Sequence, residues 1–264
     1  MERHKEDIAS RRLEKRLNER FVKAMATYHL IEDDDRILVG LSGGKDSLLL
    51  LELLAKRAKI DHPRFSVEAL HVRMENIHYE TDTSYLQAFC DGLGVPLHVR
   101  TTRFEVEPVE QTAVPQQHTE AAARLRKQKQ PCFLCSWMRR KELFNLAQEL
   151  GCNKIALGHH QDDILHTALM NLTFQGRFGS MPARLKMRKM PLTIIRPLCM
   201  IEEQDIRTYA ELQGYRKQQK VCPYENDSHR NDIRHLYDEI ERMNPEARYS
   251  MWNALNADNK LIED

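Results

Sequence analysis

The chain has 264 residues, of which 30% are charged and 41% belong to the hydrophobic set. This length excludes a disulfide-stapled miniprotein and is enough for one large domain or two smaller ones. The 40 Lys and Arg residues nearly balance the 39 Asp and Glu residues. The net charge of +1 therefore excludes a uniformly basic nucleic-acid coat, although a basic face balanced by acid elsewhere stays possible.

The sequence shows no sign of membrane insertion or export. Its longest apolar run, Leu48–Leu54, is interrupted by Glu52 and is far shorter than the roughly 20 residues of a spanning helix. No apolar h-region follows the first residues, so no signal peptide is predicted. We therefore expect a cytoplasmic protein with no membrane partner. In a reducing compartment, its six cysteines are expected to be metal ligands, catalytic thiols or core residues.

The predicted elements begin with an amphipathic, basic helix over residues 7–30, and strand-like and helix-like segments alternate after it. Strands are predicted at 36–41, 65–73, 96–104, 154–158 and 193–198. Helices are predicted at 48–58, 83–92, 135–150, 162–172 and 202–213. This alternation predicts an α/β fold, with a Rossmann-like, mostly parallel sheet flanked by helices.

The same pattern predicts three parts of the chain. Residues 1–30 form a basic N-terminal helix, residues 31–221 form an α/β domain, and residues 222–264 form a helical, acidic tail. The α/β domain contains an inserted helix that begins with a C-x-x-C motif. Residues 105–130 are its most loop-like stretch, with prolines, glutamines and no clear period.

The most informative motif is Ser42-Gly43-Gly44-Lys45-Asp46-Ser47, between a predicted strand and a predicted helix. Its glycines permit a tight turn, and its N–H groups and serine hydroxyls lie where a helix dipole favours an anion such as phosphate. The spacing from Gly40 excludes a Walker A motif, and the chain has no G-x-G-x-x-G. An ordinary capped turn is the alternative, but it does not explain so many glycines, serines and charges together.

The cysteines suggest a second site. Cys132 and Cys135 form the C-x-x-C motif, and its spacing alone fits a thioredoxin-like redox pair, two cysteines without a metal, or part of a metal site. With Cys222, they could hold three irons of a [4Fe–4S] cluster and leave the fourth iron open. The other cysteines are interpreted as packed, inert thiols: Cys90, Cys152 and Cys199.

A further polar motif runs from Gly158 to Asp163 after another predicted strand. Asp162 and Asp163 fall in the first turn of the next helix, where a carboxylate could hold Mg²⁺ on a nucleotide phosphate. A plain helix cap is one alternative. A His/Asp metal hydrolase site is another, with the candidate ligands His159, His160, Asp163 and His166.

The glycine-rich turn resembles the PP-loop of ATP pyrophosphatases, which activate a carbonyl-type oxygen by adenylation and release pyrophosphate. The order of motifs narrows this resemblance. The turn is followed by Pro131-Cys132-x-x-Cys135 with Arg139-Arg140, by the segment from Lys154 to Asp163, by Ile195-Arg196-Pro197-Leu198, and by Cys222-Pro223. From about residue 15 to about residue 256, including residues 246–255, the chain resembles the tRNA 2-thiocytidine synthetases, the tRNA-cytidine(32) 2-sulfurtransferases.

The resemblance implies cofactors and roles for individual residues. Residues 31–221 would be a PP-loop domain that binds Mg-ATP, with Asp46 also catalytic and with Mg²⁺ near Asp46 and Asp163. The residues expected to contact ATP are Ser42, Gly43, Gly44, Lys45, Asp46, Ser47, Gly158 and Asp163, with adenine near His71 and Val72. A [4Fe–4S] cluster would be held by the three catalytic cysteines Cys132, Cys135 and Cys222.

The implied reaction is thiolation of tRNA. The C2 oxygen of a flipped-out cytidine, at position 32, would attack the α-phosphate of ATP, and sulfur delivered to the open iron would then displace AMP. The implied partners are tRNA, a sulfur donor such as a cysteine desulfurase, and a second copy in a homodimer. One departure is Glu225, where many relatives carry a further cysteine. The zinc-ribbon cysteine pairs of the related 2-thiouridine enzymes are absent.

Several local basic clusters could follow an RNA backbone, although each alone is also typical of a solvated surface. They lie at residues 11–23, 124–129, 139–141, 184–189 and 216–220. Arg196 could contact phosphate or RNA, and Arg177-Phe178 could stack a splayed base unless Phe174 and Phe178 pack their loop.

Other functions fit parts of the pattern. One is an ATP-dependent ligase or amidase for a small carboxylate, with structural cysteines. Another is an ATP-gated iron–sulfur redox sensor. Persulfide chemistry through a disulfide between Cys132 and Cys222 is a variant of the thiolation mechanism.

Overall fold

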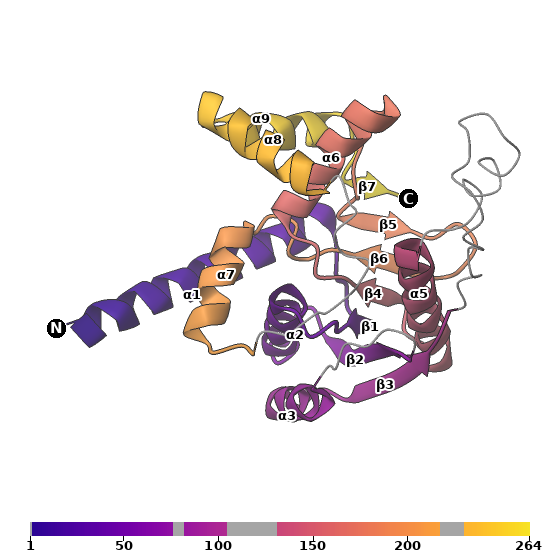
Figure 1. Cartoon of the computed structure of the whole chain (residues 1–264). Helices are drawn as coiled ribbons and strands as arrows, with labels where there is room; N and C mark the ends of the chain where they lie inside the picture. Colours follow the sequence, from indigo (N-terminus) through magenta and orange to yellow (C-terminus); the bar gives the residue numbers. More distant parts are fainter. Residues whose placement is uncertain (1, 76–81, 105–130, 217–229) are drawn as a thin grey trace, which may run out of the picture.

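The computed structural model describes residues 2–75, 82–104, 131–216 and 230–264 (Figure 1). Its strands are β1 (Asp35–Gly40), β2 (Phe65–Met74), β3 (Leu97–Thr102), β4 (Lys154–Ala156), β5 (Arg184–Lys186), β6 (Thr193–Ile195) and β7 (Ile262–Glu263). Its helices are α1 (Glu2–Tyr28), α2 (Lys45–Arg57), α3 (Thr83–Leu93), α5 (Pro131–Glu149), α6 (Gln161–Gln175), α7 (Glu203–Leu212), α8 (Arg230–Met243) and α9 (Ala247–Ala257).

The strands form one sheet in the order β3-β2-β1-β4-β6-β5-β7. Strands β3, β2, β1, β4 and β6 run parallel to one another, and β5 runs antiparallel to β6. In the centre of the sheet, Val39 of β1 lies opposite Ala69 of β2 and Ala156 of β4. The predicted α/β fold with a mostly parallel sheet is confirmed. In such a sheet, the loops at the carboxyl ends of the strands form the usual ligand site.

Two hydrophobic cores cover the two faces of the sheet, because successive side chains of a strand point in opposite directions. In β1, Ile37 and Val39 are buried in the larger core with α1 and α2, whereas Leu38 belongs to the core beneath α5. Figure 1 shows α5 on the other side of the strands from α2 and α3. Burial on both faces explains why β1 reads as a nearly continuous apolar run.

The basic helix α1 is anchored to α7 rather than presented freely. Leu17 and Phe21 are fully buried in the larger core. Arg16 pairs with Asp205 at 2.5 Å, and Arg20 pairs with Glu202 at 2.6 Å. These two arginines of the predicted basic cluster at 11–23 therefore have internal carboxylate partners in α7 and just before it.

The C-terminal tail differs from the prediction. It contains α8 and α9, but the chain then returns to the sheet as β7, which pairs with β5. Neither β5 nor β7 was predicted, because their two or three residues do not belong to an apolar run such as those that contain β4 and β6. The strand predicted at 193–198 ends at Ile195, where the N–H of Arg196 turns to donate to the carbonyl of Ala183.

Some predictions lie outside the described residues, namely the loop-like character of 105–130 and the position of Cys222. The domain boundaries at residues 30 and 222 stay predictions. Within the part of the chain that the structure describes, no helix combines the length and the apolar character needed to cross a bilayer.

Candidate active site

The glycine-rich turn lies between β1 and α2, as predicted, and is held together by its own serines. Gly43 has φ of +82°, a conformation that L side chains rarely adopt. The N–H of Gly43 donates to Ser47 Oγ at 3.1 Å, and the N–H of Gly44 donates to Ser42 Oγ at 3.3 Å. The two hydroxyl oxygens lie 3.1 Å apart. These N–H groups and hydroxyls at the start of a helix form a cradle suited to phosphate.

Gly158 brings the connection between β4 and α6 against this turn. A Cβ placed on Gly158 would lie 3.1 Å from the carbonyl carbon of Asp46 and 3.1 Å from the amide nitrogen of Ser47. These contacts are tighter than nine in ten real Cβ contacts, so the backbone of the turn would have to shift by a few tenths of an ångström to admit a side chain. The structure therefore joins two of the predicted motifs in one site and explains why Gly158 has no side chain.

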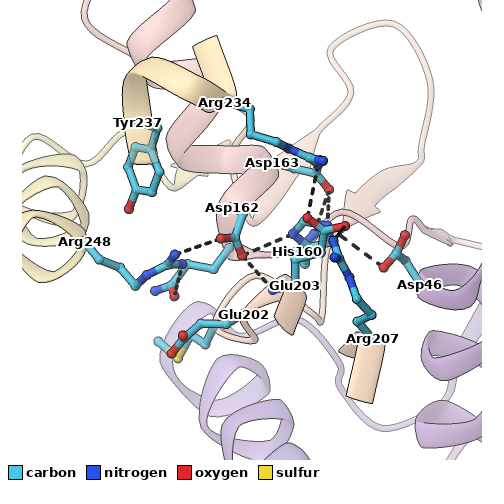
Figure 2. Close-up of polar contacts among 12 residues, drawn as sticks. Asp46, His160, Asp162, Asp163, Glu202, Glu203, Arg207, Arg234, Tyr237 and Arg248 are labelled. Carbon is cyan, nitrogen blue, oxygen red and sulfur yellow. Dashed lines mark hydrogen bonds and ion pairs between the residues drawn. The ribbon is translucent and has the colours of Figure 1, made fainter. Parts of the chain in front are cut away.

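His160 lies at the centre of a group of carboxylates (Figure 2). Its ring is 4% exposed, and Nε2 lies 3.4 Å from Asp163 Oδ2 and 4.0 Å from Asp46 Oδ1. Its Nδ1 lies 3.5 Å from Asp162 Oδ2. Burial lowers the pKa of His160, but the hydrogen bond to Asp162 and the charges of the carboxylates outweigh burial and raise it. Asp46 and Asp163 thus face the same side of one imidazole.

The donor set around His160 fits Mg²⁺ better than a transition-metal hydrolase site. Among the described residues, no three His, Cys, Asp or Glu side chains converge to hold a metal ion. His159 instead accepts a hydrogen bond from Arg196, and the ring of His166 packs on Tyr237 at 4.9 Å. The described structure therefore does not bring the four candidate ligands of the hydrolase alternative together at one point. Two carboxylates suit Mg²⁺, which usually takes its other oxygens from water and substrate phosphates.

His71 and Val72 point to opposite sides of β2, so the structure brings only His71 toward the turn. Val72 is buried in the core beneath α5. His71 is 1% exposed, and its Nδ1 lies 2.8 Å from the carbonyl oxygen of Leu41, directly before the turn. Burial lowers the pKa of His71, so the ring is neutral at pH 7 and donates from Nδ1. Its Nε2 is then a buried acceptor that has no hydrogen-bond partner among the described residues.

Arg196 is a buried cation at the carboxyl end of β6, and its side chain is 7% exposed. Its Nε donates to His159 Nδ1 at 3.3 Å, and its Nη1 donates to the carbonyl of Pro182 at 2.5 Å. Burial, and secondarily the charge of Arg140, lower the pKa of Arg196 to about 10. None of its hydrogen-bond partners among the described residues is a carboxylate, so an anion there would be stabilised.

The thiols divide partly as predicted. Cys90, Cys152 and Cys199 are free and buried, which confirms them as packed thiols. Burial raises the pKa of Cys90 to about 11, so it is protonated at pH 7. Cys135 lies half-buried on α5, against the core beneath that helix. The Cys132 side chain and Cys222 lie outside the described residues, so the three-cysteine ligand set stays a prediction.

Two aromatic side chains, one in the last turn of α6 and one in the loop that follows, are exposed to solvent. Phe174 is 56% exposed and Phe178 is 39% exposed. Neither ring is buried in the described structure, and the choice between base stacking and loop packing stays a prediction. Exposed aromatic rings beside Arg177 are compatible with base stacking.

A network that the motifs did not reveal connects the C-terminal helices to the turn. Arg248 of α9 donates to Asp162 Oδ1 at 2.8 Å, and the N–H of Glu203 donates to Asp162 Oδ2 at 2.7 Å. Burial opposes ionisation of Asp162, but hydrogen bonds from His160 and Arg248 hold its pKa far below the usual range. Glu203, at the start of α7, reaches Lys45 of the turn at 3.1 Å. The resemblance of residues 246–255 was the only sequence signal that pointed to Arg248.

Comparisons with known proteins agree with this geometry. A family model described as a PP-loop domain matches residues 9–240. A tRNA-cytidine(32) 2-sulfurtransferase of Bordetella avium (strain 197N) is 34% identical over 246 residues, which span 93% of this chain and 73% of the relative. A protein of the same name from Marinomonas sp. (strain MWYL1) is 32% identical, over 99% of this chain and 91% of the relative.

A solved structure adds a similar fold. It is the U34-tRNA thiolase NcsA from Methanococcus maripaludis with its [4Fe–4S] cluster, with 25% identity and a TM-score of 0.67. The match covers 90% of this chain and 77% of that protein. With the motifs assembled at one edge of the sheet and relatives matched over most of both lengths, the chain belongs to the PP-loop family and, within it, to the tRNA-cytidine(32) 2-sulfurtransferases.

Proposed function

We propose that this protein is an ATP-dependent tRNA sulfurtransferase that replaces the C2 oxygen of cytidine 32 with sulfur. The observation that carries the proposal is the cradle of the glycine-rich turn, with Gly158 against it and Asp46 and Asp163 on one side of His160. Relatives that match over most of their length are tRNA-cytidine(32) 2-sulfurtransferases, which supports tRNA as the substrate.

ATP would bind with its phosphates on the turn. The N–H groups of Gly43 and Gly44 would exchange their serine acceptors for phosphate oxygens, and Lys45 would neutralise charge. Asp46 and Asp163 would hold Mg²⁺, which neutralises phosphate charge as pyrophosphate leaves. The Nε2 of His71, for which the described part of the chain offers no partner, would accept a hydrogen bond from the amino group of adenine.

The acceptor base would approach from the side of β4 and β6. Its C2 oxygen attacks the α-phosphorus, so a new O–P bond forms while the bond to pyrophosphate breaks. Arg196 lies at the end of β6 without a carboxylate partner among the described residues, and it would stabilise negative charge on the nucleotide there. Sulfur then bonds to C2, and AMP leaves with the original oxygen.

The cluster and the partners complete the proposal. Cys132, Cys135 and Cys222 would hold a [4Fe–4S] cluster, and the solved thiolase carries a cluster of this type. Three protein ligands leave one iron able to bind the sulfur that is transferred. We further propose a cysteine desulfurase as the sulfur donor and a homodimer as the working assembly.

Mass spectrometry of tRNA nucleosides from a strain that lacks this protein tests the function. We expect 2-thiocytidine to disappear and to return with the wild-type chain but not with an Asp46→Ala variant. Unchanged 2-thiocytidine in the deletion strain would refute the substrate. A second assay measures pyrophosphate release from ATP with and without tRNA that lacks 2-thiocytidine. Release that depends on this tRNA would distinguish the enzyme from a small-molecule ligase and from a redox sensor.

A further inference from the structure

Three cationic side chains from three different helices converge on one carboxylate beside the glycine-rich turn. Figure 2 shows two of them, Arg207 and Arg234, with this carboxylate, Glu203. Glu203 Oε1 lies 3.1 Å from Lys45 Nζ and 3.3 Å from Arg207 Nη2. Glu203 Oε2 lies 3.1 Å from Arg234 Nη2. Lys45 belongs to the start of α2, Arg207 to α7 and Arg234 to α8. Lys45 also pairs with Asp46, so three cations share two carboxylates, and Glu203 is the one that contacts all three.

Glu203 is held in place more firmly than the two arginines that contact it. Its side chain is 17% exposed, and its backbone N–H is held by Asp162 at 2.7 Å. The side chains of Arg207 and Arg234 are 51% and 49% exposed, so their guanidinium groups have room to turn. The carboxylate holds the cations together, but the arginines are not buried around it.

A diphosphate is the natural alternative partner for such a group. Its oxygens accept hydrogen bonds from ammonium and guanidinium as a carboxylate does, and a diphosphate carries more negative charge than one carboxylate. Lys45 already contacts both the turn's Asp46, at 2.9 Å, and Glu203. A phosphate chain that enters the turn and reaches Lys45 therefore comes within reach of the cations that surround Glu203.

We propose that Arg207 and Arg234 bind the β- and γ-phosphates of ATP and the pyrophosphate that they become, and that Glu203 is the internal anion that these phosphates replace. This inference rests on the proposed function, because it assigns further residues to the same reaction. It also gives the C-terminal part of the chain a role, since α8 supplies one of the phosphate ligands. Arg234 is then a binding residue rather than part of a surface ion pair.

Calorimetric titration of the full-length protein with inorganic pyrophosphate and Mg²⁺ tests the proposal. We expect Arg207→Gln and Arg234→Gln each to weaken binding by about 3- to 10-fold, because a charged hydrogen bond is lost at a partly exposed site. Arg234→Lys should recover part of the affinity. Arg242→Gln is the matched control, since Arg242 lies on the same helix and pairs only with Glu239 among the described residues.

Glu203→Gln should have the opposite effect. Removal of the competing charge should leave pyrophosphate binding at least as tight as in the wild type. A purely structural role would instead weaken binding in all the Glu203, Arg207 and Arg234 variants and lower their melting temperatures together.

The proposal is overturned if the wild type does not bind pyrophosphate, if both arginine variants bind it normally, or if Arg242→Gln weakens binding equally. Weaker binding by Glu203→Gln would overturn the replacement step. The titration contains no tRNA and therefore tests the two arginines independently of the substrate. Weaker binding by the arginine variants would support their role even if the deletion strain kept its 2-thiocytidine. Suppose that both arginine variants bind pyrophosphate normally, but that the deletion strain loses 2-thiocytidine. That result would refute the role of the two arginines and leave the proposed function intact.

Discussion

Gly158 lies so close to the peptide bond between Asp46 and Ser47 that a methyl group in place of its hydrogen would force the backbone there to shift. An added Cβ would meet the carbonyl carbon of Asp46 and the amide nitrogen of Ser47 at 3.1 Å each. Both contacts are backbone atoms at the start of α2, so a methyl group would fit only if this part of the turn shifted by a few tenths of an ångström. The contact fixes the distance between the phosphate cradle and the carboxylates of α6.

Gly158→Ala should therefore impair ATP binding more than folding. Overpacking of this kind costs about 1–3 kcal/mol. If this cost is taken from the free energy of ATP binding, the Kd for ATP rises by about 5- to 150-fold. Equilibrium binding of ATP with Mg²⁺ would measure it. Gly92→Ala is the control, because a Cβ at Gly92 meets nothing within 4 Å. ATP affinity unchanged by Gly158→Ala would contradict the close contact.

Asp46→Ala should block adenylation. Asp46 lies on the side of His160 that also faces Asp163, and removal of one of two carboxylates leaves Mg²⁺ poorly held beside the phosphates. Loss of metal assistance is worth several kcal/mol, so release of pyrophosphate should slow by about 100-fold or more. Asp91→Ala, on the exposed face of α3, should release pyrophosphate at the normal rate. Normal release by Asp46→Ala would refute the role given to Asp46.

Cys222→Ala should abolish thiolation while ATP still binds. The turn and its carboxylates do not include Cys222, whereas two cysteines are too few to hold the proposed cluster. Iron content and visible absorbance after anaerobic reconstitution should fall, and ATP affinity should stay within about 2-fold of the wild type, a difference of about 0.4 kcal/mol. Cys152→Ala removes a packed thiol and should keep both iron and activity. Thiolation by Cys222→Ala would exclude Cys222 as an essential ligand.

The sequence predicted those parts of the site that are formed by residues close together along the chain. The turn combines glycines, serines and a helix start within six positions, and Gly158 follows a strand adjacent to β1. Parallel strands place both at one edge of the sheet, so motif and fold predict the same location. The boundaries of β2 and α3 also fall within about two residues of the prediction, as is usual for periodic segments.

The parts that were missed depend on contacts between distant segments. Lys45 and Glu203 meet because α7 packs beside α2, and no spacing along the chain encodes that contact. The contact of Arg248 with Asp162 likewise needs the C-terminal helices to return to α6. In the sequence, Glu203 is an acidic residue in the first turn of a predicted helix. Negative charge is stabilised at that position in any helix, so nothing marked Glu203 as part of the site.

Another contact of this kind lies away from the active site, around Glu52 of α2. Its side chain is nearly buried and accepts hydrogen bonds from the hydroxyl of Tyr209, at 2.6 Å, and from the hydroxyl of Tyr215. It also forms an ion pair with Lys56 at 2.8 Å. Burial raises the pKa of Glu52, but these three partners outweigh burial and lower it. Glu52 therefore joins α2 to α7 as a carboxylate.

The lowered pKa of Glu52 predicts how stability depends on pH. A carboxyl group with a depressed folded-state pKa contributes stability that is complete above its unfolded pKa, about 4.5, and is lost as pH falls through the folded value. Glu52→Gln should lower the free energy of unfolding by about 1–3 kcal/mol at pH 7, and the difference from wild type should shrink below pH 4.5. Urea unfolding at both pH values measures this difference, with Glu239→Gln as an exposed control. A difference that stayed constant with pH would show that Glu52 stabilises the fold by packing rather than by charge.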